Sequence, residues 1–478
     1  MQFETLVAIS AVLLAFLLYS THHRTGLPRV GKGGPLGFIL MALKSITSFT
    51  DLIDEGLNKY GGKAFVLPSM TGSFVLVGPE NVDIIKSSDD TAINQPISIN
   101  ENLQTMYTMN SRIQGPHFQA GVARTDVTRA GYDFIPEVLD ETRLAMSEAF
   151  ALNADQKSTS VPLFHTMTHL VARITNRPIL GTSLCRNKPF LQDVIQFTET
   201  LVVYAQLLLW FPKILRRPLY LLASSTFGGH KEPNRVLIPY LKSLIADREG
   251  GLESSASESP EEIANLEPLA MRILSISLRS IHTSSMFGSH AIFHLATLSE
   301  AERDDIRQEI IEAESECGYN KAPLSKMRKL DSTLRETGRF YSLASVDGTV
   351  VPSGYSIAVQ LKPIHFDASV YPEPEKFDCF RFSKLRETEE SVKHAFTTVE
   401  NDFLLFGLGR HVCPGRFFAS MVLKIMLSHL LLNYDVTLPD GAKEVPKPML
   451  LSLLVMPNLT GRVIIKPRVG QAAQDLEL

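Results

Sequence analysis

The sequence predicts a mainly α-helical protein with small β-sheets. Residues 122–150 and 269–298 carry helical patterns, and a third apolar helical pattern begins near Arg416. Residues 64–67 and 73–77 alternate like strands on either side of a turn at 69–72, which predicts a β-hairpin. Further apolar strands are expected near residues 450–465. Helical segments therefore outweigh strands along the chain.

The composition excludes some classes of protein. The chain has 478 residues, 44% of them hydrophobic and 21% charged, which is enough for a large folded core. A net charge of -4 argues against a general nucleic-acid-binding protein. The four cysteines, Cys185, Cys317, Cys379 and Cys413, are scattered without the spacing of metal ligands. They predict no disulfide framework and favour a reducing compartment for the catalytic part.

Residues 1–24 are expected to form an N-terminal membrane anchor. Residues 6–19 are almost wholly apolar and are followed by His22, His23 and Arg24. The run is shorter than the roughly 20 residues of a full span, so a cleaved signal peptide is the alternative. Large residues at 16–19 and positive charge after the run favour a single anchor with the remainder cytosolic. Residues 25–38 are interpreted as a Pro/Gly hinge, and residues 39–478 as one domain.

Between the hairpin and the second half, the chain offers few chemical motifs. Pro79 is placed to open a helix, and residues 95–117, which show no clear period, are interpreted as a long binding loop. Residues 201–210 predict an apolar helix, and residues 250–260 a flexible surface loop. The pairs His165/His169 and His290/His294 lack the adjacent glutamate of a zinc helix, so a structural role is favoured.

Polar residues gather in the second half. The otherwise apolar helix 269–298 has the polar centre 280–285, where hydroxyls can bond back to the preceding turn and loosen the helix into a groove. Glu336 and Arg339 are spaced to meet on one helix face, although such pairs are usually solvated. Arg381 lies in an aromatic and proline-rich stretch, residues 371–382.

A single cysteine, Cys413, stands at the entrance of the last long helical pattern. Gly409 and Gly415 flank it and leave room for a flat group, while Phe406 can shield one side of the sulfur. Backbone N–H groups at a helix start stabilise a thiolate, which predicts a lowered pKa for Cys413. A buried cysteine on a tight turn is the alternative interpretation.

Phe406, Gly409, Cys413 and Gly415 match the Phe-x-x-Gly-x-x-x-Cys-x-Gly loop, so the chain resembles the cytochrome P450 family. The resemblance covers nearly the whole chain, and the sequence around Cys413 is most similar to that of fungal family members of secondary metabolism. It implies the cytochrome P450 fold and haem b, with Cys413 as the iron ligand. The residues that it marks as contacting haem are Phe406, Gly409, His411, Gly415 and Arg124. His411 stands where the family usually has arginine, and Arg124 is equally explained as a solvated helix charge.

The same resemblance implies roles for residues upstream. Thr283 takes the place of the threonine that relays protons to bound dioxygen, and His282 the place of its acid partner. An imidazole that titrates near neutral pH can shuttle protons. Glu336, Arg339 and Arg381 are implied to form a buried ion cluster behind the haem, where the loss of one charge is severe.

The expected function is that of a haem-thiolate monooxygenase, which inserts one oxygen atom from O2 into a lipophilic small molecule by hydroxylation or epoxidation. A terpenoid or another secondary metabolite suits the apolar segments 103–109, 201–210, 280–287 and 451–457 that are expected to line the pocket. The implied electron donor is NADPH-cytochrome P450 reductase at the endoplasmic reticulum membrane, reached through a single-pass anchor. Arg410, Arg416 and Lys424 are candidates for its docking face, with solvated surface as the alternative.

Three departures from the family pattern keep other functions open. His411 replaces the usual arginine of the loop, and Cys379 replaces a usual proline. Residues 340–350, like residues 294–307, are shorter than the family's corresponding links, so either the fold tolerates the loss or the chain is a defective variant. The first alternative is a haem-thiolate isomerase or dehydratase. The presence of Thr283 argues against this alternative. The second is a membrane-tethered pseudoenzyme that has lost haem through the shortened segments.

Overall fold

The computed structural model describes most of the chain between residues 26 and 468. The described residues are 26–31, 34–46, 48–61, 63–69, 73–109, 131–152, 156–211, 213–226, 233–248, 260–317, 321–342, 346–349, 356–388, 393–451 and 454–468. The predicted anchor at 1–24, Arg124 and most of the predicted surface loop at 250–260 lie outside these residues. The described part is mainly helical with small sheets, as the sequence predicts.

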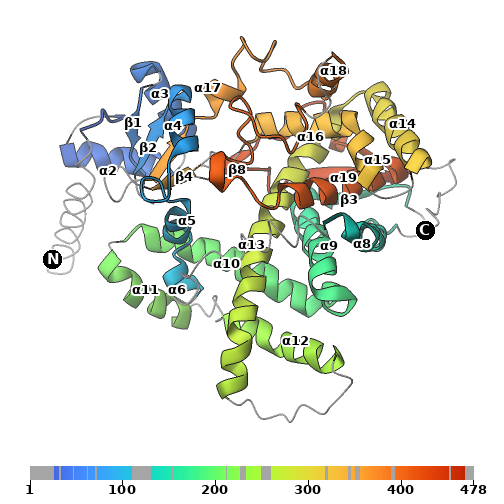
Figure 1. Ribbon diagram of the computed structural model, residues 1–478, viewed down its shortest axis with the longest axis horizontal. Helices are drawn as coiled ribbons and strands as arrows, with labels where there is room; N and C mark the ends of the chain where they lie inside the picture. The colour runs from blue at the N-terminus through green and yellow to red at the C-terminus, as the bar shows by residue number, and fades with distance from the viewer. Residues whose placement is uncertain are drawn as a thin grey trace.

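Helix α13 (Pro260–Thr297) runs through the middle of the molecule (Figure 1). Its first half packs with α9 (Leu163–Cys185), α10 (Lys188–Leu209) and α12 (Pro233–Arg248) in one buried apolar cluster. Its second half joins α8 (Ile135–Ala149), α16 (Arg328–Phe340) and α19 (Arg416–Asn433) in the largest cluster. Because buried residues in both halves of α13 pack against other helices, its central turns have a fixed position.

Helix α19 is the one described helix of sufficient length and apolarity to cross a membrane by composition. Its apolar residues from Met421 to Leu431 belong to the largest core cluster. Burial against α8, α14 and α16 explains this apolar sequence without a membrane.

A four-stranded sheet lies to one side of the helices, beside the N-terminal helices (Figure 1). Strands β1 (Phe65–Leu67) and β2 (Phe74–Val77) form the predicted antiparallel hairpin, and β5 (Ser356–Val359) pairs parallel to β2. Strand β4 (Val346–Thr349) pairs antiparallel with β5 at the sheet edge. A strand therefore still follows α16, although the sequence in this link is short.

Two smaller sheets come mainly from the C-terminal part. Strand β9 (Arg462–Pro467) pairs antiparallel with both β3 (Thr159–Pro162) and β6 (Tyr434–Thr437). Strands β7 (Met449–Leu451) and β8 (Leu454–Met456) form a two-stranded ribbon. The strands expected near residues 450–465 are thus confirmed.

The remaining helices are shorter than α13 and complete the described chain. They are α2 (Gly34–Lys44), α3 (Phe49–Tyr60), η1 (Pro79–Asn81), α4 (Val82–Ser87), α5 (Gln95–Leu103), α6 (Thr105–Thr108), η4 (Gly131–Phe134), α11 (Lys213–Thr226), α14 (Glu300–Cys317), α15 (Lys321–Lys326), α17 (Lys362–His365), α18 (Arg381–Thr388), η5 (Gly409–His411) and η6 (Pro439–Gly441).

Some boundaries differ from those that the sequence predicts. The long loop expected at 95–117 is wrong for its first part, because α5 and α6 occupy residues 95–108. Asn94 caps α5 by accepting the backbone N–H of Ile97 at 2.9 Å, and Pro96 lies in the first turn. These are local start signals for a helix whose polar sequence has no clear period. Helix α2 begins at Gly34, inside the segment interpreted as a hinge.

Gly56 tests the packing of α3 on the sheet. A Cβ added at Gly56 would lie 2.3 Å from a Phe65 ring carbon and 2.9 Å from Val30, and both side chains are fully buried. Gly56→Ala is expected to lower the free energy of unfolding by about 1–3 kcal/mol through overpacking. This loss is larger than the gain of about 1 kcal/mol from the higher helix propensity of alanine. Its thermal unfolding midpoint should fall. Gly131→Ala, whose Cβ meets no atom within 4 Å, is the control; an equal fall in both variants would contradict this explanation.

Candidate functional site

Cys413 lies on a tight turn between η5 and α19. Its backbone N–H donates to the Phe406 carbonyl at 2.8 Å, which closes the loop that the two residues bound. Arg416, the first residue of α19, donates from Nη1 to the Cys413 carbonyl at 3.0 Å. The thiol is free and half-buried. The structure therefore fixes the backbone on both sides of the sulfur and leaves the sulfur reachable.

The two flanking glycines serve different purposes. Gly409 has φ +56°, and a Cβ there would lie 2.5 Å from the Lys86 carbonyl oxygen, so only glycine lets the loop approach α4. At Gly415 a Cβ would meet no atom within 4 Å. The space beside Gly415 agrees with the prediction that a flat group approaches this loop.

The pKa of Cys413 differs from the sequence prediction. Burial raises the pKa of the thiol above its ordinary value, and this outweighs the N–H groups of Gly415 and Arg416 and the charges of Arg416 and Arg279, which all lower it. The predicted net lowering is therefore wrong for the free protein. Because the donors and cations are already in place, they favour the thiolate once a metal ion removes the proton.

The central turns of helix α13 have one exposed stripe among buried side chains. Arg279 and Thr283, one turn apart, are exposed, whereas Leu278, Ile281 and Ser285 are buried. One turn after Thr283, Phe287 packs on Phe396, which packs on Phe406, so this part of α13 lies beside the cysteine loop. The charge of Arg279 also acts on Cys413. The structure thus brings Thr283 and Cys413 to one region from segments 130 positions apart in the sequence.

The hydroxyls of α13 bond back along the helix, as the sequence predicts. Thr283 Oγ1 donates to the Arg279 carbonyl, and Ser285 Oγ donates to the Ile281 carbonyl at 2.6 Å. Helix α13 nevertheless continues unbroken through these residues. The back-bonds therefore do not open the helix in this structure.

His282 does not have the environment that its predicted role requires. Its Nε2 lies 2.7 Å from Thr198 Oγ1 of α10, and burial lowers the pKa of its imidazole to about 4. The expectation of an imidazole titrating near neutral pH is wrong, because desolvation disfavours the cation. At neutral pH His282 is an uncharged hydrogen-bonding partner of α10.

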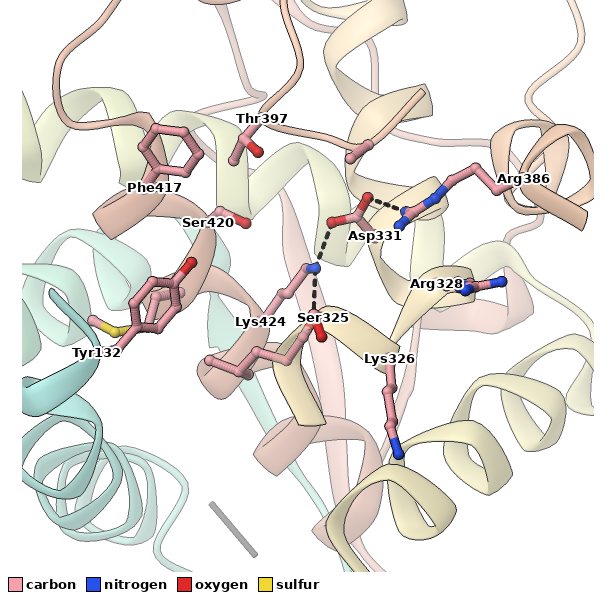
Figure 2. A pocket seen from close by; sticks show the side chains of 13 residues that line it. Tyr132, Ser325, Lys326, Arg328, Asp331, Arg386, Thr397, Phe417, Ser420 and Lys424 are labelled. Atoms are coloured by element: carbon pink, nitrogen blue, oxygen red, sulfur yellow. Dashed lines mark hydrogen bonds and ion pairs between the residues drawn. The ribbon is translucent and has the colours of Figure 1, made fainter. Parts of the chain in front are cut away.

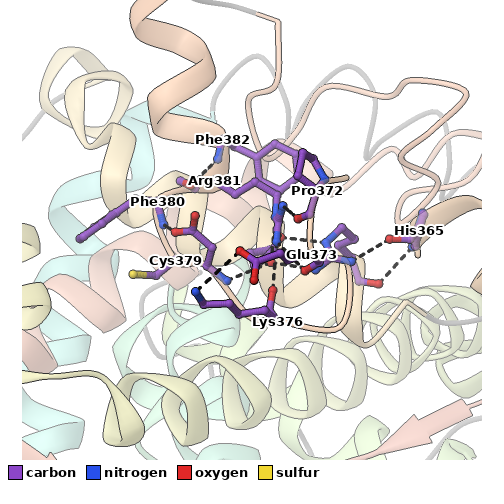
Figure 3. Close-up of polar contacts among 12 residues, drawn as sticks. His365, Pro372, Glu373, Lys376, Cys379, Phe380, Arg381 and Phe382 are labelled. Atoms are coloured by element: carbon purple, nitrogen blue, oxygen red, sulfur yellow. Dashed lines mark hydrogen bonds and ion pairs between the residues drawn. The ribbon is translucent and has the colours of Figure 1, made fainter. Parts of the chain in front are cut away.

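Glu336, Arg339 and Arg381 meet as the sequence predicts. Figure 3 shows Arg381 among the polar contacts of this region. Arg339 forms two hydrogen bonds to the Glu336 carboxylate, at 2.8 and 2.9 Å, and both side chains are fully buried. Arg381 Nε reaches the same carboxylate at 3.1 Å. Arg339 Nη1 also donates to the His365 carbonyl at 2.7 Å. One buried carboxylate thus satisfies two guanidinium groups and joins α16 to the segment before α18.

The sequence analysis missed Arg335, which is also fully buried. Its Nη1 donates to the carbonyls of Ala395 and Thr398, its Nη2 pairs with Glu400, and its guanidinium lies 4.0 Å from the Phe403 ring centroid. A charged residue in a helical pattern is ordinarily solvated, so no sequence signal marks Arg335 as buried. Arg335 anchors the segment that leads into the cysteine loop.

Two aromatic and histidine contacts continue this anchoring. Phe396 packs edge-on against Phe406 at 5.2 Å between ring centroids. The backbone N–H of Leu404 donates to His365 Nε2 at 3.0 Å, and burial lowers the pKa of His365 to about 3. A neutral His365 can accept this bond at physiological pH, which connects the loop to the Glu336 cluster.

A second buried charge cluster lies behind α19, at a cavity of about 420 Å³ (Figure 2). Asp331 accepts from Arg386 Nη1 and the Phe396 N–H, each at 2.8 Å, and pairs with Lys424. Lys424 also donates to the Leu324 carbonyl at 2.9 Å. The expectation that Lys424 belongs to a docking surface is wrong, because its side chain is buried in this cluster.

The remaining predicted site residues have the following positions. Phe406 is half-buried and packs on the largest core cluster, and His411 Nε2 lies 2.7 Å from Asp90 Oδ1. Arg410 is exposed. The structure therefore pairs His411 with a carboxylate of the chain, while Arg124 is not among the described residues.

His290 and His294 pack as core side chains. His290 stacks on Tyr341 at 3.7 Å and bonds to the Val455 carbonyl at 3.0 Å, while His294 stacks on Phe377 at 3.6 Å. His294 Nε2 also lies 3.0 Å from the Tyr341 hydroxyl. These contacts give both rings a structural role, as the sequence analysis favoured.

Comparison with known proteins shows which family has a sequence like that of this chain. Residues 126–465 match the family model described as Cytochrome P450. Cytochrome P450 monooxygenase 103 of Postia placenta is 28% identical over 494 residues, covering 97% of this chain and 97% of the relative. Cytochrome P450 monooxygenase bsc11 of Alternaria brassicicola is 30% identical over 460 residues, covering 89% and 87%. Cytochrome P450 monooxygenase olcJ of Penicillium canescens is 29% identical, covering 87% and 84%.

A haem-thiolate cofactor follows from the family match, and the described residues fit it. The half-buried thiol receives two backbone N–H groups, and the space beside Gly415 is open. The exposed stripe of α13 faces the same sulfur. The thiol and the open space beside Gly415 can therefore accommodate a planar group that has a thiolate ligand.

Arg339→Ala is expected to destabilise the protein by about 3–5 kcal/mol, because it leaves Glu336 buried without its main partner. Denaturant unfolding and the yield of folded protein measure this effect. Lys376→Ala is the control: its pair with Glu373 spans 3.8 Å between side chains exposed by 69% and 76%, so the loss should stay below about 1 kcal/mol. Similar losses in both variants would mean that the buried cluster does not stabilise the fold.

Stability should fall in acid because of His294. Burial lowers the pKa of His294 to about 3, whereas a histidine in the unfolded chain titrates near about 6.5. As the pH falls, His294 is protonated in the unfolded chain at a higher pH than in the folded protein. Its contribution to the stability of the folded protein is therefore complete above about pH 6.5 and is lost as the pH falls toward the folded pKa.

The His294 contribution to the slope of unfolding free energy reaches about 1.4 kcal/mol per pH unit. His294→Phe keeps a ring against Phe377 and should flatten the slope between about pH 6 and pH 4, measured by denaturant titration at each pH. A slope in His294→Phe equal to that of the wild type would refute this assignment.

Proposed function

This chain belongs to the cytochrome P450 family and is a P450 monooxygenase, and from that premise we propose the substrate class and the roles of its residues. The proposed reaction inserts one oxygen atom of O2 into a lipophilic small molecule, by hydroxylation or epoxidation, and releases the other oxygen atom as water. A terpenoid or another secondary metabolite is the proposed substrate. The observation that carries the proposal is the half-buried Cys413 thiol opposite the open stripe of α13.

Cys413 is the proposed iron ligand. When bound, the haem-thiolate cofactor supplies the activation of dioxygen, since a thiolate ligand donates electron density that favours O–O cleavage. The chain's part is to present the sulfur at the start of α19 and to keep it in place. The Phe406 carbonyl, Arg416 and the Gly409 approach to α4 fix the loop for that purpose.

Thr283 is the proposed proton-relay residue. Its side chain is exposed on the part of α13 that lies beside the cysteine loop, and its hydroxyl donates to the Arg279 carbonyl. The same Oγ1 can instead accept a proton from water and donate one toward the reacting oxygen. His282 orients this part of α13 through Thr198, because its neutral imidazole is not an acid at physiological pH.

The apolar part of the substrate is proposed to lie along α10, α6 and α13. Met109 after α6, Leu201 of α10 and Ile281 of α13 belong to one buried cluster. Three of the segments expected to line the pocket therefore converge next to the open stripe of α13. An apolar lining of this kind suits a lipophilic ligand.

The proposal extends to the electron donor and the cellular location. An NADPH-dependent flavoprotein reductase would dock near the cysteine loop, where Arg410 is exposed and Arg416 begins α19. The apolar run at residues 6–19 supports single-pass anchoring in the endoplasmic reticulum membrane with a cytosolic catalytic domain.

The thiolate assignment is tested by the spectrum of the reduced, CO-bound protein. The wild type should show the red-shifted Soret band of a thiolate ligand, and Cys413→Ala should lose it. Cys379→Ala, which removes another buried free cysteine, should keep the band. Retention of the band in Cys413→Ala would refute the assignment. Consumption of NADPH and O2 with a reductase, and formation of oxygenated product, then test the reaction itself.

A further inference from the structure

Arg279 is a charged, exposed residue on the largely apolar central part of α13. It lies on α13, one turn before Thr283, and Thr283 Oγ1 bonds to its carbonyl. Its neighbours Leu278 and Ile281 are buried and apolar. A guanidinium in such surroundings is costly unless an anion or a set of acceptors compensates it.

Arg279 lies beside the cysteine loop. About two turns after it on α13, Phe287 packs on Phe396 at 5.3 Å between ring centroids, and Phe396 packs on Phe406 of the loop at 5.2 Å. The charge of Arg279 also acts on the Cys413 thiol. The Arg279 side chain is exposed, so a ligand can reach it.

Within the described part of the chain, Arg279 has no ion-pair partner. Its side chain forms one hydrogen bond, from Nη1 to Ser275 Oγ at 3.1 Å on its own helix. By contrast, the buried arginines Arg335, Arg339 and Arg386 each pair with a carboxylate. A guanidinium stays protonated at any physiological pH, so the donors of Arg279 that Ser275 does not use can bind an anion.

We propose that Arg279 binds the carboxylate of the substrate, so that the oxidised molecules are lipophilic carboxylic acids. This inference rests on the proposed function and specifies its substrate class. The planar fork of a guanidinium matches a carboxylate with two parallel hydrogen bonds. Such a contact beside Thr283 would hold the acid end near the cysteine side and leave the apolar part along α10.

The cofactor's own propionates are the competing anions. They lie at the edge of a haem, whereas Arg279 acts on the sulfur at its centre. Two measurements separate the ligands: the haem content of the purified protein, and the affinity for a carboxylate compared with an uncharged molecule of the same length. Substitution of a residue that binds a propionate would change the haem content, whereas substitution of a residue that binds substrate would change the affinity for the carboxylate.

The experiment compares dodecanoate with dodecanol, by equilibrium dialysis and by the Soret shift on binding to the ferric holoprotein. The wild type should bind dodecanoate more tightly than dodecanol. Arg279→Gln should weaken dodecanoate binding by about 10- to 100-fold, the range for a charged hydrogen-bonded contact. It should leave dodecanol affinity and haem content unchanged, and Arg279→Lys should recover part of the dodecanoate affinity.

Arg272→Gln is the matched control, because Arg272 is also exposed on α13 and lies about two turns before Arg279. It should bind both ligands as the wild type does. Equal affinity of the wild type for both ligands, equal loss of both in Arg279→Gln, or loss of haem in that variant would overturn the inference. Dialysis needs no turnover, so a wild type that selects dodecanoate but oxidises nothing would contradict the proposed reaction and leave the Arg279 assignment standing.

Discussion

The buried ion pair between Glu336 and Arg339 is the interaction on which the rest of the structure depends. Both side chains are fully buried, and their bonds reach the His365 carbonyl and Arg381. Ions this deep are stable only when every partner is present. The pair therefore couples α16, the segment before α18 and the segment that contains His365 into one unit, and none of these can move without leaving a charge unpaired.

That unit positions the cysteine loop through a series of short contacts. His365 accepts from Leu404, Arg335 binds carbonyls near Phe396, and Phe396 packs on Phe406. Phe406 in turn accepts the N–H of Cys413. On the other side of the loop, Asp331 and Lys424 join α16 to α19. The sulfur is thus held from both ends by the same helix, α16, which itself contributes no residue to the cysteine loop.

Helix α13 supplies the opposite wall, and its composition explains why it carries chemistry. Most of its central side chains are buried apolar residues that fix it against α9 and α19. The open stripe with Arg279 and Thr283 is the exception. A rigid helix with two polar side chains on one face orients donors without the entropic cost that a loop would incur. The same rigidity explains why back-bonded hydroxyls leave the helix unbroken.

The sequence by itself determined the cysteine loop and the hairpin, because these depend on local spacing and turn chemistry. Glu336 and Arg339 are spaced to meet on one helix face, whereas the roles of Thr283 and Arg381 followed from the resemblance of the chain to a known family. Only the tertiary structure decided which charges are buried, since burial depends on partners distant in sequence. Arg335 and Lys424 are like any surface cation in a helical pattern, yet both are buried and paired. His282 loses its near-neutral pKa for the same reason, because α10 covers it and removes the water that would solvate its charge.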